Sequence, residues 1–155
     1  MADLQALLAR VCDLEKAATS IGDAWPFLFI SQGTTPYWVN FIRGPQVDDD
    51  SEGYDVYTYD VLMRLIIGHV TEGADGEPEG DLYTYIPQVI EYFRARPLLI
   101  DDTYTTELDA LEEARVVEGT GFAVFSQTGV RTAQIGCQFT LRCRFEEEIS
   151  YASFN

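Results

Sequence analysis

Residues 137–145 alternate strictly between apolar and polar side chains, and this run constrains the fold more than any other part of the sequence. The apolar positions are Cys137, Phe139, Leu141, Cys143 and Phe145, and the polar positions are Gln138, Thr140, Arg142 and Arg144. Because successive residues of a β-strand point to opposite faces of a sheet, the run predicts a strand with one face in the core. The other face carries two arginines, and three surroundings stay open for it: water, an acidic loop of the same chain, or a neighbouring subunit.

Two segments have the three- and four-residue spacing of apolar side chains that is typical of a helix with one buried stripe. The first covers residues 3–16, and the segment that contains Gly22 is expected to end it. The second covers residues 82–93 and is expected to stop before Pro97. Pro87 lies inside the second pattern, so it should kink the helix or mark an irregular first turn.

The remaining segments predict strands, because they are rich in aromatic and β-branched residues. They are residues 27–30, residues 37–42 with an end at Gly44-Pro45, residues 54–70, and residues 116–125, which a turn at 127–129 joins to the C-terminal strand. The long segment 54–70 alternates at first and then becomes almost wholly apolar, which predicts that both its faces are covered towards Ile67, one of them by the second helix. Residues 101–114 suit either a short helix or an extended acidic loop.

These elements predict one α+β domain over residues 1–155. Its mixed or antiparallel sheet would have about four to five strands and would be packed by two helices. A chain of this length can bury roughly two-thirds of its unfolded surface, which is enough for one core.

The chain is strongly acidic, with 10 Lys and Arg against 26 Asp and Glu and a formal charge of -16 at pH 7. Such a surface repels phosphate, which argues against sequence-specific nucleic-acid binding, whereas an acidic wall lets DNA pass without adsorbing. Hydrophobic residues make up 46% of the chain, which excludes the disordered class. No run reaches the roughly 18 apolar residues of a membrane helix, so we expect a protein made in the cytoplasm, with no membrane partner.

Residues 48–53 crowd like charges, with acidic side chains at four of six positions. Such a cluster prefers solvent, so it predicts a mobile loop, or a loop that becomes ordered only against a basic partner.

The sequence holds no recognisable arrangement of catalytic side chains. The single histidine, His69, ends a long apolar segment and is expected to be a satisfied core or rim residue. Cys12, Cys137 and Cys143 are expected to be small core side chains, because their spacing with His69 does not suit a metal. The acidic clusters are consecutive, whereas a calcium loop needs alternating ligands. We therefore predict no catalytic site, no metal and no cofactor.

Three features carry a resemblance to a known family. They are the N-terminal helix leading into Trp25-Pro26-Phe27-Leu28-Phe29-Ile30, the helix with Pro87 after the long strand, and the alternating C-terminal strand. In this order, and over most of the chain, they resemble the tail terminator proteins of long-tailed, lambda-like bacteriophages (siphoviruses). The sequence departs from the family pattern in the aromatic strand at 37–42 and in the long acidic loop.

The resemblance implies a homo-oligomer, normally a hexameric ring, in the neck and tail of the virion. The ring would cap the tail tube, end its polymerisation and join it to the head connector. Its partners would be the tail tube protein and the head–tail connector protein, and DNA would pass through the lumen without specific binding. Contacts with other subunits or rings are expected at Asp48, Asp49, Asp50, Glu52, Arg43, Arg142 and Arg144.

Three other functions stay open. A connector or adaptor (tail-completion) protein of the same neck would share the acidity and the ring symmetry. A cytosolic module could bind a small ligand between the sheet and the second helix, with a lining of Tyr83, Tyr85, Tyr92 and Trp38. An enzyme could use paired carboxylates such as Asp55 and Asp60, but their odd separation along a strand would place them on opposite faces.

Overall fold

The computed structural model of the chain describes residues 2–27, 35–51, 54–71, 79–119, 121, 123–125 and 132–148. In chain order its elements are α1 (Leu4–Thr19), β1 (Ala24–Trp25), β2 (Tyr37–Ser51), β3 (Tyr54–Thr71), α2 (Glu79–Arg94), β4 (Leu111–Gly119), β5 (Ala123–Phe125) and β6 (Thr132–Glu148). The strands form a six-stranded sheet in the order β1-β2-β3-β6-β4, with β5 also paired to β6. Every strand pair is antiparallel except β1–β2.

The predicted α+β class with a mixed sheet and two helices is confirmed, and the sheet has more strands than expected. The extra strand arises because the single strand expected at 116–125 is divided into β4 and β5, which pair with different parts of β6.

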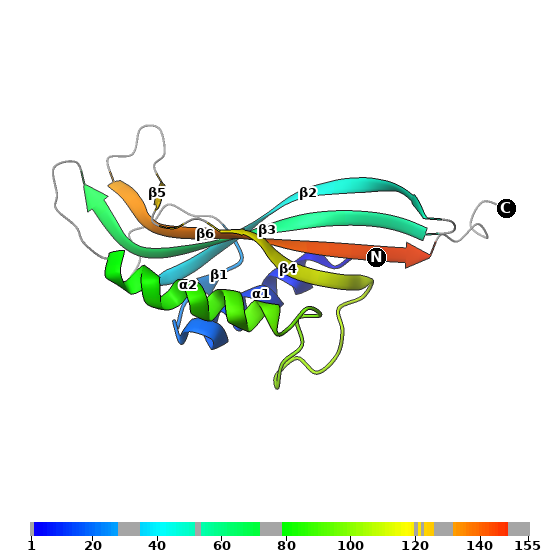
Figure 1. Cartoon of the computed structure of the whole chain (residues 1–155), viewed down its shortest axis with the longest axis horizontal. Helices are drawn as coiled ribbons and strands as arrows, with labels where there is room; N and C mark the ends of the chain where they lie inside the picture. Colours follow the sequence, from blue (N-terminus) through cyan, green and yellow to red (C-terminus); the bar gives the residue numbers. More distant parts are fainter. Residues whose placement is uncertain are drawn as a thin grey trace.

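Both helices pack on the same face of the sheet, which we call the inner face; the opposite face is the outer face (Figure 1). The alternation predicted for residues 137–145 is confirmed, because its five apolar side chains are all buried against the helices. From the other side the core is filled by Leu7, Val11 and Leu14 of α1 and by Leu82, Val89 and Phe93 of α2. The two arginines of the alternating run lie on the outer face and are exposed.

Helix α1 is closed at both ends by its own residues. The side chain of Asp3 accepts a hydrogen bond from the Ala6 N–H at 3.0 Å, which satisfies one of the free donors of the first turn. Ser20 adopts a left-handed conformation with φ 59°, and its N–H donates to the Lys16 carbonyl at 2.8 Å. Within the segment expected to end the helix, Ser20 rather than Gly22 therefore takes the left-handed position.

A buried polar pair connects α1 to β2. The Asn40 amide donates to Glu15 Oε1 at 2.7 Å and to the Trp25 carbonyl at 3.2 Å. Glu15 is fully buried, and this burial raises its pKa well above the ordinary value. Glu15 Oε2 and Asn40 Oδ1 have no hydrogen-bond partner among the described residues.

Helix α2 runs from Glu79 to Arg94 with Pro87 in its interior. A proline there cannot donate to the carbonyl four residues earlier, that of Tyr83. Both Pro87 and Tyr83 are exposed, so water can satisfy this carbonyl on the outer side of the helix. This position explains how one continuous helix accommodates the proline.

Of the two alternatives for 101–114, the loop is correct for 101–110, and residues 111–114 belong to a strand. The chain here is held by side chains: Asp101 Oδ1 accepts hydrogen bonds from the backbone N–H groups of Thr103 and Tyr104. Arg10 of α1 reaches across and donates to the Thr106 carbonyl at 2.7 Å. Strand β4 then begins at Leu111.

Two predictions near the start of the sheet need correction. A buried strand was expected at 27–30, but the strand is β1, and Phe27 follows it with 53% of its surface exposed. Residues 28–30 lie outside the described residues.

The second correction is that β2 does not end at Gly44-Pro45. These two residues both lie opposite Tyr59, because Arg43 pairs with Asp60 and Gln46 pairs with Thr58. The extra residue is absorbed as a β-bulge, for which Gly44 takes a φ of 121° that other residues rarely adopt. The backbone of Asp48, Asp49 and Asp50 therefore belongs to β2 and not to a mobile loop.

The long strands of the sheet extend further than the helices that pack on it. A helix of 16 residues, as in α2, spans about 24 Å, whereas a strand of 18 residues, as in β3, spans about 60 Å. Residues 45–51 of β2, 54–58 of β3 and 145–148 of β6 consequently project beyond α2 (Figure 1). We call this three-stranded projection the arm.

Candidate interaction surfaces

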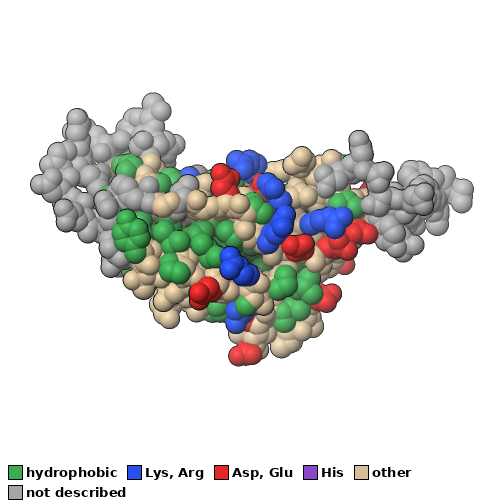
Figure 2. Space-filling model, viewed as in Figure 1, with side chains coloured by type: hydrophobic (Ala, Val, Ile, Leu, Met, Phe, Trp, Pro, Cys, Tyr) green, Lys and Arg blue, Asp and Glu red, His purple; other side chains and the backbone are tan. Residues whose placement is uncertain are grey.

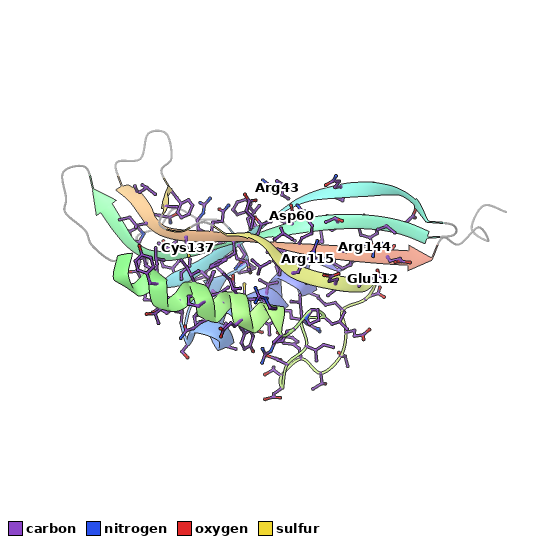
Figure 3. The ribbon with its side chains drawn as sticks, in the orientation of Figure 1. Arg43, Asp60, Glu112, Arg115, Cys137 and Arg144 are labelled. Carbon is purple, nitrogen blue, oxygen red and sulfur yellow. The ribbon has the colours of Figure 1, made fainter. Side chains whose placement is uncertain are left out.

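A charged row crosses the outer face at the base of the arm. Arg43 of β2 lies opposite Asp60 of β3, Asp60 lies opposite Arg142 of β6, and Arg142 lies opposite Arg115 of β4. Arg142 donates two hydrogen bonds to the Asp60 carboxylate, at 3.0 and 3.2 Å, and Arg43 Nη2 lies 3.7 Å from the same group. Asp60 therefore lies between two arginines; Figure 3 labels Asp60 and Arg43 of this row.

A second ion pair lies closer to the arm, two residues along β6 from Arg142. Arg144 Nη1 is 2.7 Å from Glu112 Oε2, at the start of β4 (Figure 3). In the first pair, the hydrogen bond to Asp60 is the main cause of the raised pKa of Arg142. Because Arg43, Arg142 and Arg144 are largely exposed, each pair contributes only about 0–1 kcal/mol to folding.

These contacts show where the predicted contact residues lie. Arg43, Arg142 and Arg144 come together on the outer face, and acidic side chains of the same chain already pair with all three. Asp48, Asp49 and Asp50 lie in the arm, but their side chains are outside what the structure describes, and so is Glu52. The sequence pattern found the arginines without identifying Asp60 or Glu112 as their partners.

The other half of the outer face is apolar. The Arg64 guanidinium lies 3.9 Å from the ring centre of Phe125 and 5.6 Å from that of Phe41. It also donates to Gln138 Oε1 at 3.0 and 3.2 Å, and burial lowers its pKa. Tyr37, Val39 and Ile66 form a small buried cluster in this region. Both faces of β3 are thus covered towards Ile67, as predicted.

The residues before α1 reach the base of the arm, where the Ala2 N–H donates to the Tyr57 hydroxyl at 3.3 Å; beyond this contact the inner side of the arm forms an open groove of about 510 Å³. Its lining is Ala2, Pro45, Val47, Asp55, Tyr57, Tyr59 and Glu147. The side chain of Val47 in this lining is 70% exposed. Nothing in the sequence pattern indicated this groove, because strand ends look alike whether or not a helix covers them.

A smaller groove of about 280 Å³ lies between α2 and the outer edge of β4; we call it the α2–β4 groove. Ile90, Pro97 and Val116 make it apolar, and Arg94 and Arg115 flank it. Arg115 lies 3.8 Å from Glu113, whereas Arg94 has no ion pair among the described residues. Figure 2 shows hydrophobic and basic side chains close together over α2 and β4.

The titratable groups of the interior are held in structural contacts. His69 Nε2 lies 3.0 Å from the Tyr37 hydroxyl, which also accepts a hydrogen bond from Gln134. Cys12, Cys137 and Cys143 are free and buried, as predicted. Burial raises the pKa of Cys12 and of Cys137 to about 12, so neither thiol supplies a nucleophilic thiolate near neutral pH. Over the described ranges, no group of three or more His, Cys, Asp or Glu side chains is arranged to hold a metal.

The structure separates the residues of the two other candidate sites. Trp38 is fully buried and donates to Thr19 Oγ1, whereas Tyr83 is 70% exposed, so they cannot line one cavity. Asp60 lies in the charged row, and Asp55 lies in the groove on the inner side of the arm. The prediction that these two carboxylates occupy opposite faces is confirmed.

Comparison with known proteins finds no matching family model and no similar sequence among curated proteins. In the part of the chain that is described, neither helix is long and apolar enough to cross a membrane.

Proposed function

We propose that this chain is a structural protein that assembles into a ring, in the manner of the tail terminator of a long-tailed phage. In that role the ring would cap the tail tube, end its polymerisation and form the junction with the head connector. The observation that carries the proposal is the arm. It extends the sheet beyond the helices and leaves apolar side chains such as Val47 without a covering layer in their own chain.

An uncovered apolar surface of this kind is typical of a protein–protein contact. In an isolated subunit, it costs free energy that burial against another subunit would recover. The structure keeps the order of elements on which the resemblance rests, a helix followed by long strands, a second helix and a long C-terminal strand.

The net charge supports the same role. A ring around a DNA channel functions better if its wall does not adsorb the genome, and a charge of -16 repels phosphate. A connector of the same neck would share this property, so the two roles differ in which ring each binds. Binding to tail tube subunits distinguishes them.

The experiment is to measure the mass of the purified chain by sedimentation and light scattering over a range of concentrations, with electron microscopy of the particles. We expect a closed ring, either alone or on the ends of added tail tubes, and tubes that stop growing when it is present. A chain that stays monomeric at every concentration, both with and without tubes, would contradict the proposal.

A further inference from the structure

The α2–β4 groove offers an apolar hollow with an unused positive charge. Ile90, Pro97 and Val116 line it, and Arg94 at its rim has no ion pair among the described residues. The neighbouring cations of β4 and β6, Arg115 and Arg144, already have acidic partners. The groove therefore suits a ligand with an apolar side chain next to a carboxylate.

The arm has an apolar side chain next to a carboxylate. Val47 and Pro45 project their apolar side chains along the edge of β2, on the same side as Asp55. Asp55 is exposed and, like Arg94, has no ion pair within the described ranges. The sequence from residue 45 to residue 58 contains five acidic residues and no lysine or arginine.

Neither edge is suited to simple strand addition. On β2, Pro45 lacks an N–H and lies in the bulge, which interrupts the ladder of backbone groups. On β4, the outward N–H of Ala114 already donates to the Pro97 carbonyl at 2.7 Å. Contact between the two edges must therefore be made by side chains.

We propose that the arm of one copy of this chain docks in the α2–β4 groove of the next copy. In this contact Val47 enters the apolar hollow and Asp55 pairs with Arg94. The arm and the groove are different surfaces of one chain, so the contact is heterologous and repeats from copy to copy until a ring closes. This inference rests on the proposed ring and identifies the surfaces that build it.

A charge exchange tests the ion pair. Asp55→Lys and Arg94→Glu should each weaken assembly by at least about tenfold, because each places like charges in contact. The variant that carries both substitutions should recover rings, since the pair is restored with reversed sign. Asp102→Lys, which makes the same charge change as Asp55→Lys on the loop after α2, should assemble like the unmodified chain. Melting curves should show that all four variants are folded.

A disulfide tests the position of Val47. The three native cysteines are buried, so Val47→Cys combined with Glu113→Cys provides the only exposed thiols among the described residues. Within one chain two strands separate β2 from β4, a gap of about 14 Å that a disulfide cannot bridge. Oxidation should therefore produce a ladder of linked subunits, whereas Val124→Cys with Glu113→Cys should produce none.

The outcomes separate this inference from the proposed function. If the unmodified chain forms rings and neither charge reversal nor the cysteine pair affects them as described, the docking is wrong and the ring stands. If the unmodified chain stays monomeric, both are wrong. Rings lost in each single variant, regained in the double variant and linked through Val47→Cys support the docking.

Discussion

The part of the sheet that the helices cover, which we call the body, is built from the same strands as the arm. The two regions differ in what covers them. In the body, β3 places Val61, Met63 and Leu65 in the core without exposed surface, because α1 and α2 lie over its inner face. In the arm, the paired strand β2 exposes 70% of Val47 on that same face. The difference shows that alternation decides which way a side chain points, whereas the reach of the helices decides whether it is buried.

The comparison predicts that stability depends on the body and assembly on the arm. Substitutions in the covered half of the sheet should therefore lower the free energy of unfolding, whereas those in the arm should hardly change it. The following four experiments examine this division.

The largest effect is expected for Phe139→Ala. Phe139 is fully buried at the centre of β6, and its ring centre lies 6.2 Å from that of Trp38, so truncation leaves a cavity. We expect a loss of about 3–5 kcal/mol in the free energy of unfolding, measured by urea denaturation. Val47→Ala in the arm is the matched variant and should change it by less than about 0.5 kcal/mol. Equal losses would contradict the division.

Gly136→Ala should destabilise by about 3 kcal/mol, because the strands of the body cannot separate to admit a methyl group. A Cβ at residue 136 would lie 1.7 Å from the Leu65 carbonyl oxygen of β3, which is a collision with backbone. At Gly121 the same substitution meets nothing within 4 Å and is the control. Thermal melting of both variants measures the contrast, and a Gly136→Ala variant as stable as Gly121→Ala would show that β3 and β6 are not so closely packed.

Glu15→Gln should stabilise the body at neutral pH and flatten its pH dependence. Burial raises the pKa of Glu15 in the folded chain above the unfolded value of about 4.3. Above that pH the unfolded chain loses the proton first, so stability falls as pH rises towards the folded pKa. The glutamine keeps the acceptor for Asn40 and removes the carboxyl whose ionisation favours the unfolded chain, for a gain of about 1 kcal/mol.

Denaturation of the Glu15→Gln variant and of the unmodified chain from pH 5 to pH 8 measures this difference. Glu91→Gln, at an exposed position of α2, controls for the loss of one negative charge. If the Glu15→Gln and unmodified curves run parallel, the buried carboxyl does not govern the pH dependence.

The smallest effect is expected for Asp60→Asn, at the base of the arm. It removes the carboxylate that Arg43 and Arg142 share, and surface pairs of this kind contribute about 0–1 kcal/mol. Denaturation at low and high salt should show a loss that shrinks as salt screens the arginines. Asp55→Asn, without an ion pair among the described residues, should show no loss in the monomer. A loss that does not change with salt would point to packing and not to charge.

The sequence predicted several parts of the body correctly. Helical spacing located α1 and α2, alternation located β6 and its buried cysteines, and the switch from alternation to continuous apolar residues located the covered end of β3. Each of these depends on side-chain periodicity within one element, which is a local property of the chain. The odd separation of Asp55 and Asp60 likewise fixed their opposite faces.

The sequence alone did not determine how the helices and strands pair and pack with one another. Gly44-Pro45 is typical of a strand end, yet β3 holds the chain on both sides of it and turns it into a bulge. Arg43 and Arg142 were predicted as contact residues, but only the register of three strands brings Asp60 between them. The arm and the α2–β4 groove depend on where helices stop relative to strands, and that relation exists only in the tertiary structure, because a helix advances about 1.5 Å per residue and a strand about 3.3 Å.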